Sequence, residues 1–314
     1  MTYFITGASG HIGNNLVRYI RKKEKAARIV ALTRRKIDRE LAGVDCEQIV
    51  GNLQDGAFLS SLVEPNACFI HSAGLIDLTD KRAEETFRIN YDWTRTVTDV
   101  CREKGVRLIY VGSVDGLAHT GESPIAEPSE FSPDAVEGNY GKSKAMAMQY
   151  IAEVSAAHPD FSAVTVLPSA VIGGHDYKPS AVGGVIRSVL RGGAEFGIRG
   201  GYNFVNVRDV CKAIYTLTQN DLRGAFILSG ENVSVREMYE AINHKKGYHR
   251  RPIILPVWLV RLFLPFVRVL NKITLKALTD PHDYSYAWAA RELGYSPTPF
   301  EETLDETIAF FENE

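Results

Sequence analysis

The sequence predicts an α/β fold, in which helices cover both faces of a doubly wound parallel sheet. Two features of the 314 residues predict it. Five short apolar segments alternate with helical segments over the first half of the chain, and a sixth apolar segment follows. The first of these segments leads through a glycine-rich turn straight into an amphipathic helix, which is the strand–turn–helix unit of such sheets.

The glycine-rich turn follows a strand expected over residues 2–6. Gly7 permits a tight turn, Gly10 lets backbone amides approach a pyrophosphate, and Gly13 lets the helix pack closely against the strand. The positive end of the helix dipole favours an anion at the same point. The spacing therefore predicts a Rossmann-type dinucleotide site, whose expected cofactor-binding residues here are Gly7, Ser9, Gly10, His11, Ile12 and Gly13.

The second strand, expected over residues 28–33, ends in Thr33 and is followed by Arg34, Arg35 and Lys36. An acidic side chain at this point binds the adenosine ribose of NAD(H), whereas arginine suits the 2′-phosphate of NADP(H). We therefore expect Thr33, Arg34 and Arg35 to bind NADP(H). NAD(H) is the alternative cofactor, and a solvated run of charges is the alternative explanation.

The third and fourth strands, residues 47–50 and 68–71, are followed by further candidates for cofactor binding. After the third strand, Asn52 and Leu53 are expected beside the adenine. Small residues after the fourth strand let the backbone lie close to the cofactor, and they are Ser72, Ala73 and Gly74. A long helix over about 82–104 comes next and contains Asn90.

Ser113 follows the fifth strand, which is expected over residues 106–111. A long polar loop, about 118–139, then leads to a helix that begins at Tyr140, and loops of that length are usually functional. A sixth strand covers 163–167. Because the carboxyl ends of parallel strands share one edge of the sheet, the glycine-rich turn and Ser113 are expected at the same edge.

Tyr140 and Lys144 are four residues apart, so on a helix they lie on the same face. A lysine ammonium beside a phenol favours the phenolate and lowers the tyrosine pKa from about 10. Such a tyrosine transfers a proton to a carbonyl or from an alcohol. We expect Ser113 to polarise the substrate oxygen and Asn90 to hold a water in a proton relay.

Beyond residue 170, paired glycines interrupt the pattern. We expect strands at 204–207 and 225–228, and helices at about 209–219, 235–245, 257–270, 287–293 and 300–311. The chain is therefore expected to form two domains. Residues 1–168, with about 204–230, form the dinucleotide-binding domain, and about 169–203 with 231–314 form a smaller α/β substrate-binding domain.

Composition excludes several function classes. Hydrophobic residues make up 45% and charged residues 24% of the chain, and a net charge of −2 gives no field that favours nucleic acid. The four cysteines are far apart, so we expect no metal site and a cytoplasmic location. The apolar segment 255–270 is shorter than the ~20 residues of a spanning helix. We expect an amphipathic helix there, with peripheral membrane contact as the alternative.

These motifs together resemble the extended short-chain dehydrogenase/reductase family. The residues that carry the resemblance, which covers nearly the whole chain, are 6–13, 51–55, 113, 140–144 and 204–209. It implies that Ser113, Tyr140 and Lys144 are catalytic, that Pro168 and Ser169 border the nicotinamide, and that the protein forms a homodimer. The chain departs from the family at Asn52, where an aspartate is usual.

The family contains reductases as well as nucleotide-sugar epimerases and dehydratases. The last two usually place an asparagine and an arginine where this chain has Ala170 and Tyr202, neither of which can contact a diphosphate in that way. Dehydratases use an acidic pair, whereas Asp115 supplies one acid. Residues 167–173 and the apolar segment after 256 look more like the dihydroflavonol-reductase and 3β-hydroxysteroid-dehydrogenase branch.

We therefore expect an NADP(H)-dependent oxidoreductase that transfers hydride between nicotinamide and a ketone, aldehyde or secondary alcohol of a hydrophobic small molecule. The alternative is an NAD-dependent nucleotide-sugar epimerase or dehydratase. A non-catalytic dinucleotide sensor is disfavoured by the intact Tyr–Lys pair. The candidate substrate-binding residues are Ser113, Asp115, Tyr177, Tyr202 and Trp258.

Overall fold

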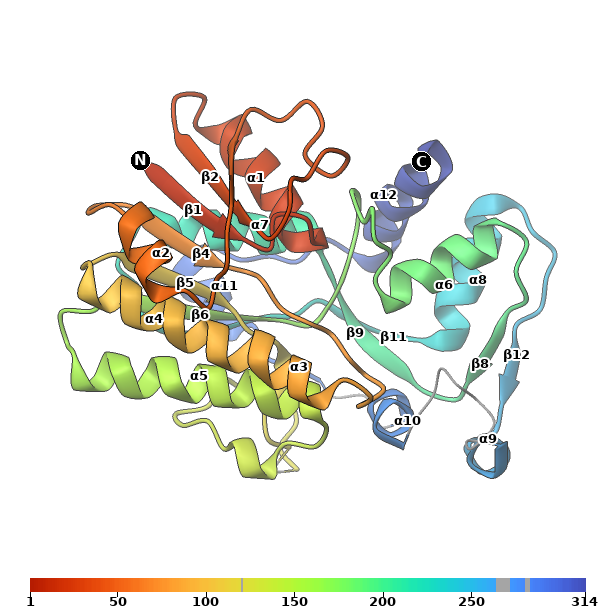
Figure 1. Ribbon diagram of the computed structural model, residues 1–314. Coiled ribbons are helices and arrows are strands. Elements are labelled where there is room, and N and C mark those ends of the chain that lie inside the picture. Colours follow the sequence, from red (N-terminus) through yellow and green to blue (C-terminus); the bar gives the residue numbers. More distant parts are fainter. Residues whose placement is uncertain (120, 264–271, 280–282) are drawn as a thin grey trace.

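A seven-stranded sheet forms the centre of the computed structural model, which describes residues 1–119, 121–263, 272–279 and 283–314 (Figure 1). Its spatial order is β10-β6-β5-β4-β1-β2-β3, and every neighbouring pair is parallel. The doubly wound α/β fold is thus confirmed. The strands are β1 (Thr2–Thr6), β2 (Arg28–Thr33), β3 (Glu47–Val50), β4 (Cys68–His71), β5 (Arg107–Val111), β6 (Ala163–Pro168) and β10 (Gly224–Leu228).

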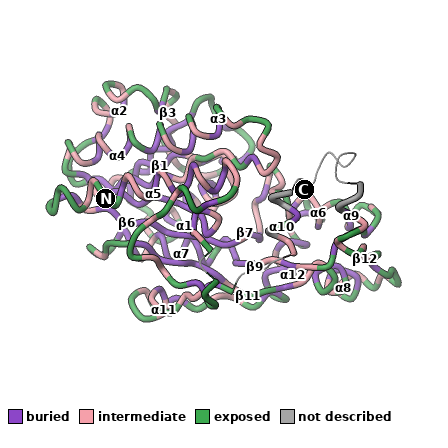
Figure 2. The backbone as a smooth tube through the Cα atoms, turned by 90° about the horizontal axis from the view of Figure 1, so that it is seen from below, coloured by how far each residue is buried: buried purple, intermediate pink, exposed green. Residues whose placement is uncertain are grey.

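Helices cover both faces of this sheet (Figure 1). Successive strand side chains point to opposite faces, so Tyr3 and Ile5 pack into one buried cluster and Phe4 into the other. Figure 2 shows the central strands of this sheet as largely buried. One face is covered by α1 (His11–Lys23), α7 (Val207–Thr218) and α11 (Ala287–Leu293), and the other by α2 (Gly56–Leu62), α4 (Trp93–Glu103) and α5 (Asn139–Ala157).

The strand order reverses between β1 and β4. From β1 the chain continues to β2 and β3 on one side, and it then returns to β4, β5 and β6 on the other. Ligands of doubly wound sheets bind at such a reversal, outside the carboxyl ends of the strands. The turns after β1, β2, β4, β5 and β6 therefore define where a site is to be sought.

The long helix expected over about 82–104 is interrupted. It consists of α3 (Ala83–Phe87), a π-helical turn (Arg88–Asp92) and α4. The π turn contains Asn90, whose side chain bonds outside its own helix to the segment after β4 and to α5. Such turns often occur at functional sites, and these long-range bonds have no signature in local sequence.

The rest of the chain forms a second group of elements to one side of the large sheet (Figure 1). The strand expected at 204–207 is β9, which ends at Asn206 and belongs to a separate three-stranded sheet, β11-β9-β7. Two-stranded pairing joins β8 to β12. The strands are β7 (Ala170–Ile172), β8 (Phe196–Ile198), β9 (Gly201–Asn206), β11 (Glu231–Ser234) and β12 (Ile253–Leu255). The division into two domains stays a prediction.

The helices expected at 235–245 and 300–311 are confirmed in this second group, whereas those at 181–190 and 272–279 were not predicted. For the helix expected at 257–270, the structure describes α9 (Val257–Phe263), and residues 264–270 lie outside the described part. The remaining helices are α6 (Ala181–Leu190), α8 (Val235–Lys246), α10 (Lys272–Thr279) and α12 (Phe300–Asn313), and single 3-10 turns cover Val114–Gly116 and Pro133–Ala135. No helix within the described ranges is long and apolar enough to cross a membrane.

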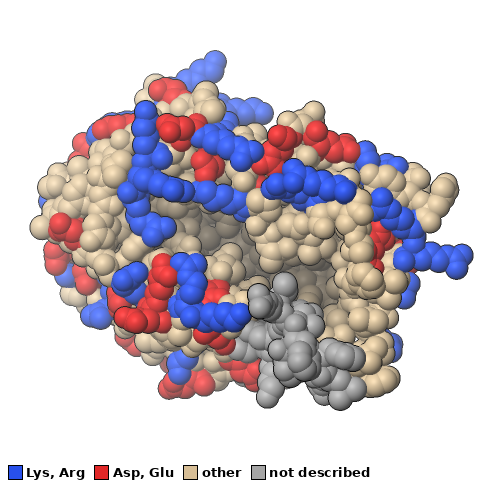
Figure 3. All heavy atoms as spheres, turned by 45° about the vertical axis from the view of Figure 1, so that its right-hand side comes forward, with Lys and Arg blue, Asp and Glu red and all other residues tan. Residues whose placement is uncertain are grey.

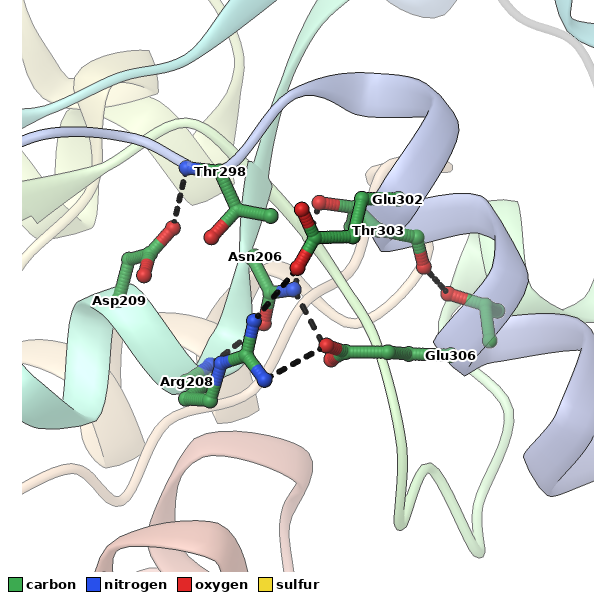
Figure 4. A network of polar contacts seen from close by, with 8 residues as sticks. Asn206, Arg208, Asp209, Thr298, Glu302, Thr303 and Glu306 are labelled. Atoms are coloured by element: carbon green, nitrogen blue, oxygen red, sulfur yellow. Dashed lines mark hydrogen bonds and ion pairs between the residues drawn. The ribbon is translucent and has the colours of Figure 1, made fainter.

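Polar side chains at the junction of β9 and α7 hold α12 in place (Figure 4). The side chain of Asn206 accepts from the Arg208 N–H at 2.8 Å, which caps α7, and its amide nitrogen donates to Glu306 at 3.0 Å. The Arg208 guanidinium also pairs with Glu306, and Asp209 accepts from the Thr298 N–H at 2.6 Å. We call this set the junction network: Asn206, Arg208, Asp209, Thr298, Glu302, Thr303 and Glu306.

The four cysteines are free thiols: Cys46, Cys68, Cys101 and Cys211. Burial raises the pKa of Cys68 to about 12, so this thiol stays protonated. Across the described ranges there is no group of three or more His, Cys, Asp or Glu side chains that could hold a metal ion. The cytoplasmic location stays a prediction.

Candidate active site

The turn after β1 requires glycine at two positions. Gly7 has a φ of 73°, and a Cβ on it would lie 2.7 Å from the backbone of Ser72 and Ala73. A Cβ on Gly13 would lie 2.2 Å from the Gly7 carbonyl oxygen, so any side chain there would push α1 off the turn. The turn is closed by the Gly10 N–H, which donates to that same oxygen at 2.8 Å. Close approach therefore explains the spacing, and cofactor binding by the turn stays a prediction.

The end of β2 leads from the core to the surface. Thr33 is buried, and its hydroxyl has no hydrogen-bond partner among the described residues. Arg34 and Arg35 are exposed, and the Arg34 guanidinium lies 5.6 Å from the centre of the Trp93 ring. This stacking orients one guanidinium beside the strand end, where the sequence predicts the 2′-phosphate.

The two candidates for adenine binding differ in burial. Asn52 is exposed, and its side-chain oxygen accepts from the Gln54 N–H at 3.1 Å, which fixes the turn after β3. Leu53 is only 3% exposed and packs in the core, so its backbone is the part available to a ligand. Adenine binding by either residue stays a prediction.

The segment after β4 is fixed to both neighbouring elements. Ser72 donates to the Thr6 carbonyl oxygen at 2.7 Å, which joins this segment to the end of β1. A Cβ on Gly74 would lie 3.3 Å from both the Asn90 side-chain oxygen and the Lys144 ammonium nitrogen. A larger residue at 74 would press on the lysine ammonium and on the Asn90 side chain.

Asn90 holds this segment against α5. Its side-chain oxygen accepts from the Leu75 N–H at 2.7 Å. Its amide nitrogen donates to the Leu75 carbonyl oxygen and to the Ser143 hydroxyl, each at 3.0 Å. These three bonds explain a positioning role for Asn90, and the proton-relay role stays a prediction.

The three residues predicted to be catalytic come from β5 and α5. Ser113 lies two residues after β5, and Tyr140 and Lys144 lie in the first turns of α5, where both are buried. The Lys144 ammonium donates to the Val111 carbonyl oxygen at 2.8 Å and lies 4.9 Å from the centre of the Tyr110 ring. One strand end therefore holds the lysine while presenting the serine.

Burial shifts both titrating groups away from their usual behaviour. It lowers the pKa of Lys144 to about 7, because a buried ammonium loses its hydration. Burial also raises the pKa of Tyr140, and the nearby Asp115 carboxylate raises it further, whereas hydrogen bonding with Ser113 lowers it. The expected lowering of the Tyr140 pKa is therefore wrong for the chain by itself. The Tyr140 hydroxyl keeps its proton and is available as a donor.

Asp115 connects Ser113 to the second group of elements. Ser113 donates to one carboxylate oxygen at 3.2 Å and accepts from the Asp115 N–H at 3.2 Å. The Tyr202 hydroxyl, on β9, donates to the other carboxylate oxygen. Burial raises the pKa of Asp115, and the bonds from Tyr202 and Ser113 oppose that shift. Three predicted substrate residues thus form one partly buried cluster across the two sheets.

The other two predicted substrate residues lie elsewhere. The Tyr177 ring packs edge-on against Phe310 of α12 at 5.2 Å, and the Arg39 guanidinium lies 5.5 Å from its centre. Trp258, on α9, is 65% exposed. No contact within the described ranges joins either ring to the Ser113 cluster, and their roles stay predictions.

The end of β6 provides the last predicted cofactor residues. Pro168 ends the strand, and the Ser169 N–H donates to the Leu228 carbonyl oxygen at 3.2 Å. The Ser169 hydroxyl is buried and, in the described ranges, without a partner, like that of Thr33. Both lie just where strands of the sheet end, on opposite sides of the glycine-rich turn. A dinucleotide lying across the strand ends fits these two hydroxyls and the close approach at Gly7.

Sequence reasoning missed a segment that crosses the start of α1. Residues 174–178, after β7, receive hydrogen bonds from Asn14 and Asn15. Lys178 reaches the Ser9 carbonyl oxygen at 3.3 Å. The polar pair in the first turn of α1 was the available signal. Its partners lie about 160 residues away, so spacing could not identify them. Figure 3 shows Lys and Arg side chains gathered along the rim of a hollow between the two parts of the molecule.

The fold and this site define a class of protein: nicotinamide-dependent enzymes with a glycine-rich turn, a serine and a Tyr–Lys pair at the ends of a parallel sheet. The sequence profile of the NAD dependent epimerase/dehydratase family matches residues 3–227, and the chain belongs to this family. It is an enzyme of the extended short-chain dehydrogenase/reductase type that uses a nicotinamide cofactor.

Relatives span nearly the whole chain. Sterol demethylase protein B from Methylococcus capsulatus is 25% identical over 326 residues, which cover 99% of this chain and 98% of that protein. A putative dihydroflavonol 4-reductase from Synechocystis sp. is 27% identical over 334 residues, covering 99% and 94%. The crystal structure of gox2253 superposes with a TM-score of 0.84 at 25% identity, covering 99% and 98%.

Proposed function

We propose that this protein is an NADP(H)-dependent dehydrogenase or reductase. It transfers hydride between the nicotinamide and a ketone, aldehyde or secondary alcohol of a hydrophobic small molecule. The observation that carries the proposal is the buried cluster of Ser113, Tyr140 and Lys144 beside the glycine-rich turn. A tyrosine that keeps its proton and a serine at the same strand end supply what a carbonyl needs as it gains a hydride.

The bound nicotinamide supplies hydride in reduction and accepts it in oxidation. Tyr140 donates its proton to the carbonyl oxygen in reduction, and in oxidation its phenolate form takes a proton from the alcohol. The Ser113 hydroxyl, held by Asp115, hydrogen-bonds the same oxygen and keeps it near Tyr140. The protonated form of Lys144, whose pKa is about 7, stabilises the phenolate left behind and returns a proton to it, becoming a neutral amine.

The residues that would hold the cofactor follow from the strand ends. The turn at Gly7–Gly13 would hold the pyrophosphate, and Thr33 with Arg34 and Arg35 would hold the adenosine ribose and its 2′-phosphate. Exposed arginines, with no acidic residue directly after β2, support NADP(H) over NAD(H). Ser169 supports the placement of the nicotinamide at the end of β6.

The substrate class rests on two supports. The names of the sterol and dihydroflavonol relatives refer to large, mainly apolar ring systems. Tyr202 is a phenol that donates to the Asp115 carboxylate, so neither residue supplies a positive charge for a sugar-nucleotide diphosphate. We also propose that the protein forms a homodimer. Light scattering tests this proposal, and a monomeric mass would contradict it.

The experiment follows NADPH and NADH oxidation with aldehydes, flavanonols and 3-ketosteroids, beside UDP-sugars read for epimerised or keto products. We expect an apolar carbonyl to be turned over with NADPH preferred. A changed UDP-sugar without net cofactor consumption would contradict the proposal and favour an epimerase or dehydratase. If NADH were oxidised in preference to NADPH, the proposed hydride transfer would stand, but the proposed roles of Arg34 and Arg35 would be contradicted.

A further inference from the structure

The segment of residues 174–178 is fixed onto the first turn of α1. The His11 ring nitrogen Nε2 and the Asn15 amide both contact the Gly174 carbonyl oxygen at 3.0 Å. The Asn14 amide donates to the His175 carbonyl oxygen at 3.1 Å. His175 itself has a φ of 59°, a conformation that non-glycine residues rarely adopt. The segment is therefore held over the turn that binds pyrophosphate in this fold.

This attachment puts the Lys178 ammonium between two strand ends. Its nitrogen lies 2.6 Å from a Glu40 carboxylate oxygen and 3.3 Å from the Ser9 carbonyl oxygen. Ser9 belongs to the turn after β1, and Glu40 to the segment after β2. Because β1 and β2 are adjacent and parallel, the ammonium lies over the gap between their carboxyl ends. In doubly wound sheets that gap holds the adenosine ribose of a dinucleotide.

The charges around this gap suit a dianion. Burial would raise the pKa of Glu40, but its bond to Lys178 and the charges of Lys178 and Arg35 hold the pKa below its usual value. The carboxylate is therefore charged and already balanced. Arg35 and the stacked Arg34 leave the local charge positive, and a phosphate monoester carries about −1.5 to −2 at pH 7.

We propose that Lys178 is a specificity-determining residue for the cofactor. Its ammonium pairs with the 2′-phosphate of NADP(H), and Glu40 is the partner it exchanges for that phosphate. Half of the Lys178 side chain is exposed, and its four-carbon stem allows the ammonium to turn from one anion to the other. The inference rests on the proposed preference for NADP(H) and adds a third cation, from a segment remote in sequence.

Glu40 also offers an opposite explanation. A free carboxylate between β1 and β2 would bind the ribose hydroxyls of NAD(H), as acidic residues in this fold do. In that case Lys178 would suppress NAD(H) binding by occupying Glu40. Removal of the lysine would then tighten NADH rather than weaken NADPH, so the two explanations predict different results for one variant.

The test is calorimetric binding of four ligands in two matched pairs. NADPH and NADH differ only by the 2′-phosphate, as do adenosine 2′,5′-bisphosphate and 5′-AMP. The variants are Lys178→Met, Lys178→Arg and Glu40→Gln. Lys276→Met is the control, because Lys276 forms a Lys–Glu pair of the same 2.6 Å length with Glu137, away from the glycine-rich turn. Circular dichroism verifies that each variant is folded.

We expect Lys178→Met to weaken NADPH and the bisphosphate about tenfold, and to leave NADH and 5′-AMP within about twofold. Lys178→Arg retains the preference, Glu40→Gln tightens the phosphorylated ligands, and the control changes neither pair. The inference is overturned if Lys178→Met weakens the binding of both members of a pair equally, changes the binding of neither, or tightens the binding of NADH. A wild-type chain that binds NADH as tightly as NADPH overturns the proposed preference as well. A preference that survives Lys178→Met overturns this inference alone.

Discussion

The junction network and the candidate catalytic residues Ser113, Tyr140 and Lys144 each join elements that are far apart in sequence, but only the second group is buried throughout. In the junction network the side chains are paired with one another, as Arg208 is with Glu306 and Asp209 with the Thr298 N–H. Among the candidate catalytic residues, burial lowers the pKa of Lys144 and raises that of Tyr140. Buried polar groups that satisfy each other stabilise a fold, whereas those kept at shifted pKa values are available for chemistry.

The largest effect is expected when the hydroxyl of Tyr140, the proposed proton donor, is removed and its ring is kept. Tyr140→Phe should lower kcat by about 10³-fold, because general acid catalysis contributes about 10²–10⁴-fold. The Kd of NADPH should stay within about twofold of wild type, since the ring is retained. Stopped-flow turnover and calorimetric binding measure the two quantities.

The matched control for Tyr140→Phe lies on the same helix. Tyr150 donates to Asp99 at 2.7 Å on the outer side of α5, away from the strand ends. Tyr150→Phe should leave kcat unchanged. Near-wild-type turnover in Tyr140→Phe would contradict the proposed mechanism.

The second-largest effect is expected when a substitution breaks the junction network. Asn206→Ala removes the cap of α7 and leaves the buried Thr303 and the partly buried Glu306 without a partner amide. We expect the free energy of unfolding to fall by about 2–3 kcal/mol in urea denaturation. At low temperature, turnover per folded molecule should be unchanged. If the fully folded Asn206→Ala variant lost kcat, the junction network would have a role beyond stability.

The third prediction is that the buried ammonium of Lys144 lowers the free energy of unfolding of the wild type. Lys144→Met should abolish turnover and raise the free energy of unfolding by about 1–2 kcal/mol, because a buried ammonium is replaced by an apolar side chain. Between the folded pKa of about 7 and the unfolded value of about 10.4, the unfolded wild type binds more protons, so its stability rises with pH. The advantage of Met should therefore be complete below pH 7 and fade towards pH 10. A gain independent of pH would contradict a buried charge at Lys144.

The smallest effect concerns Asp115. Its carboxylate raises the Tyr140 pKa, so Asp115→Asn should move the alkaline limb of the kcat/KM profile about one unit lower. Tyr202→Phe, which removes the hydroxyl bonded to Asp115, leaves that charge in place and should move the limb much less. Equal shifts in both variants would point to altered packing rather than to charge.

Local pattern was sufficient for the large sheet and for the position of Tyr140 and Lys144 near the start of one helix, because strand spacing and helix periodicity determine both. It did not determine burial, so the direction of the Tyr140 pKa shift was wrong. It could not identify partners remote in sequence. Those partners explain the π turn at Asn90, the separate sheet of β9 and the contact of Lys178 with Ser9.

The absence of a loop between β9 and α7 has a consequence for recombining this protein with relatives. Asn206 ends a strand of the small sheet and caps a helix of the large one, so the two parts share a residue rather than a linker. A chimaera that exchanges the second group of elements would have to transfer residues 206–209 together with 298–306, because these two segments bond to each other in the junction network. New substrate preferences are therefore more easily grafted through the β8 segment, which contributes no residue to the junction network.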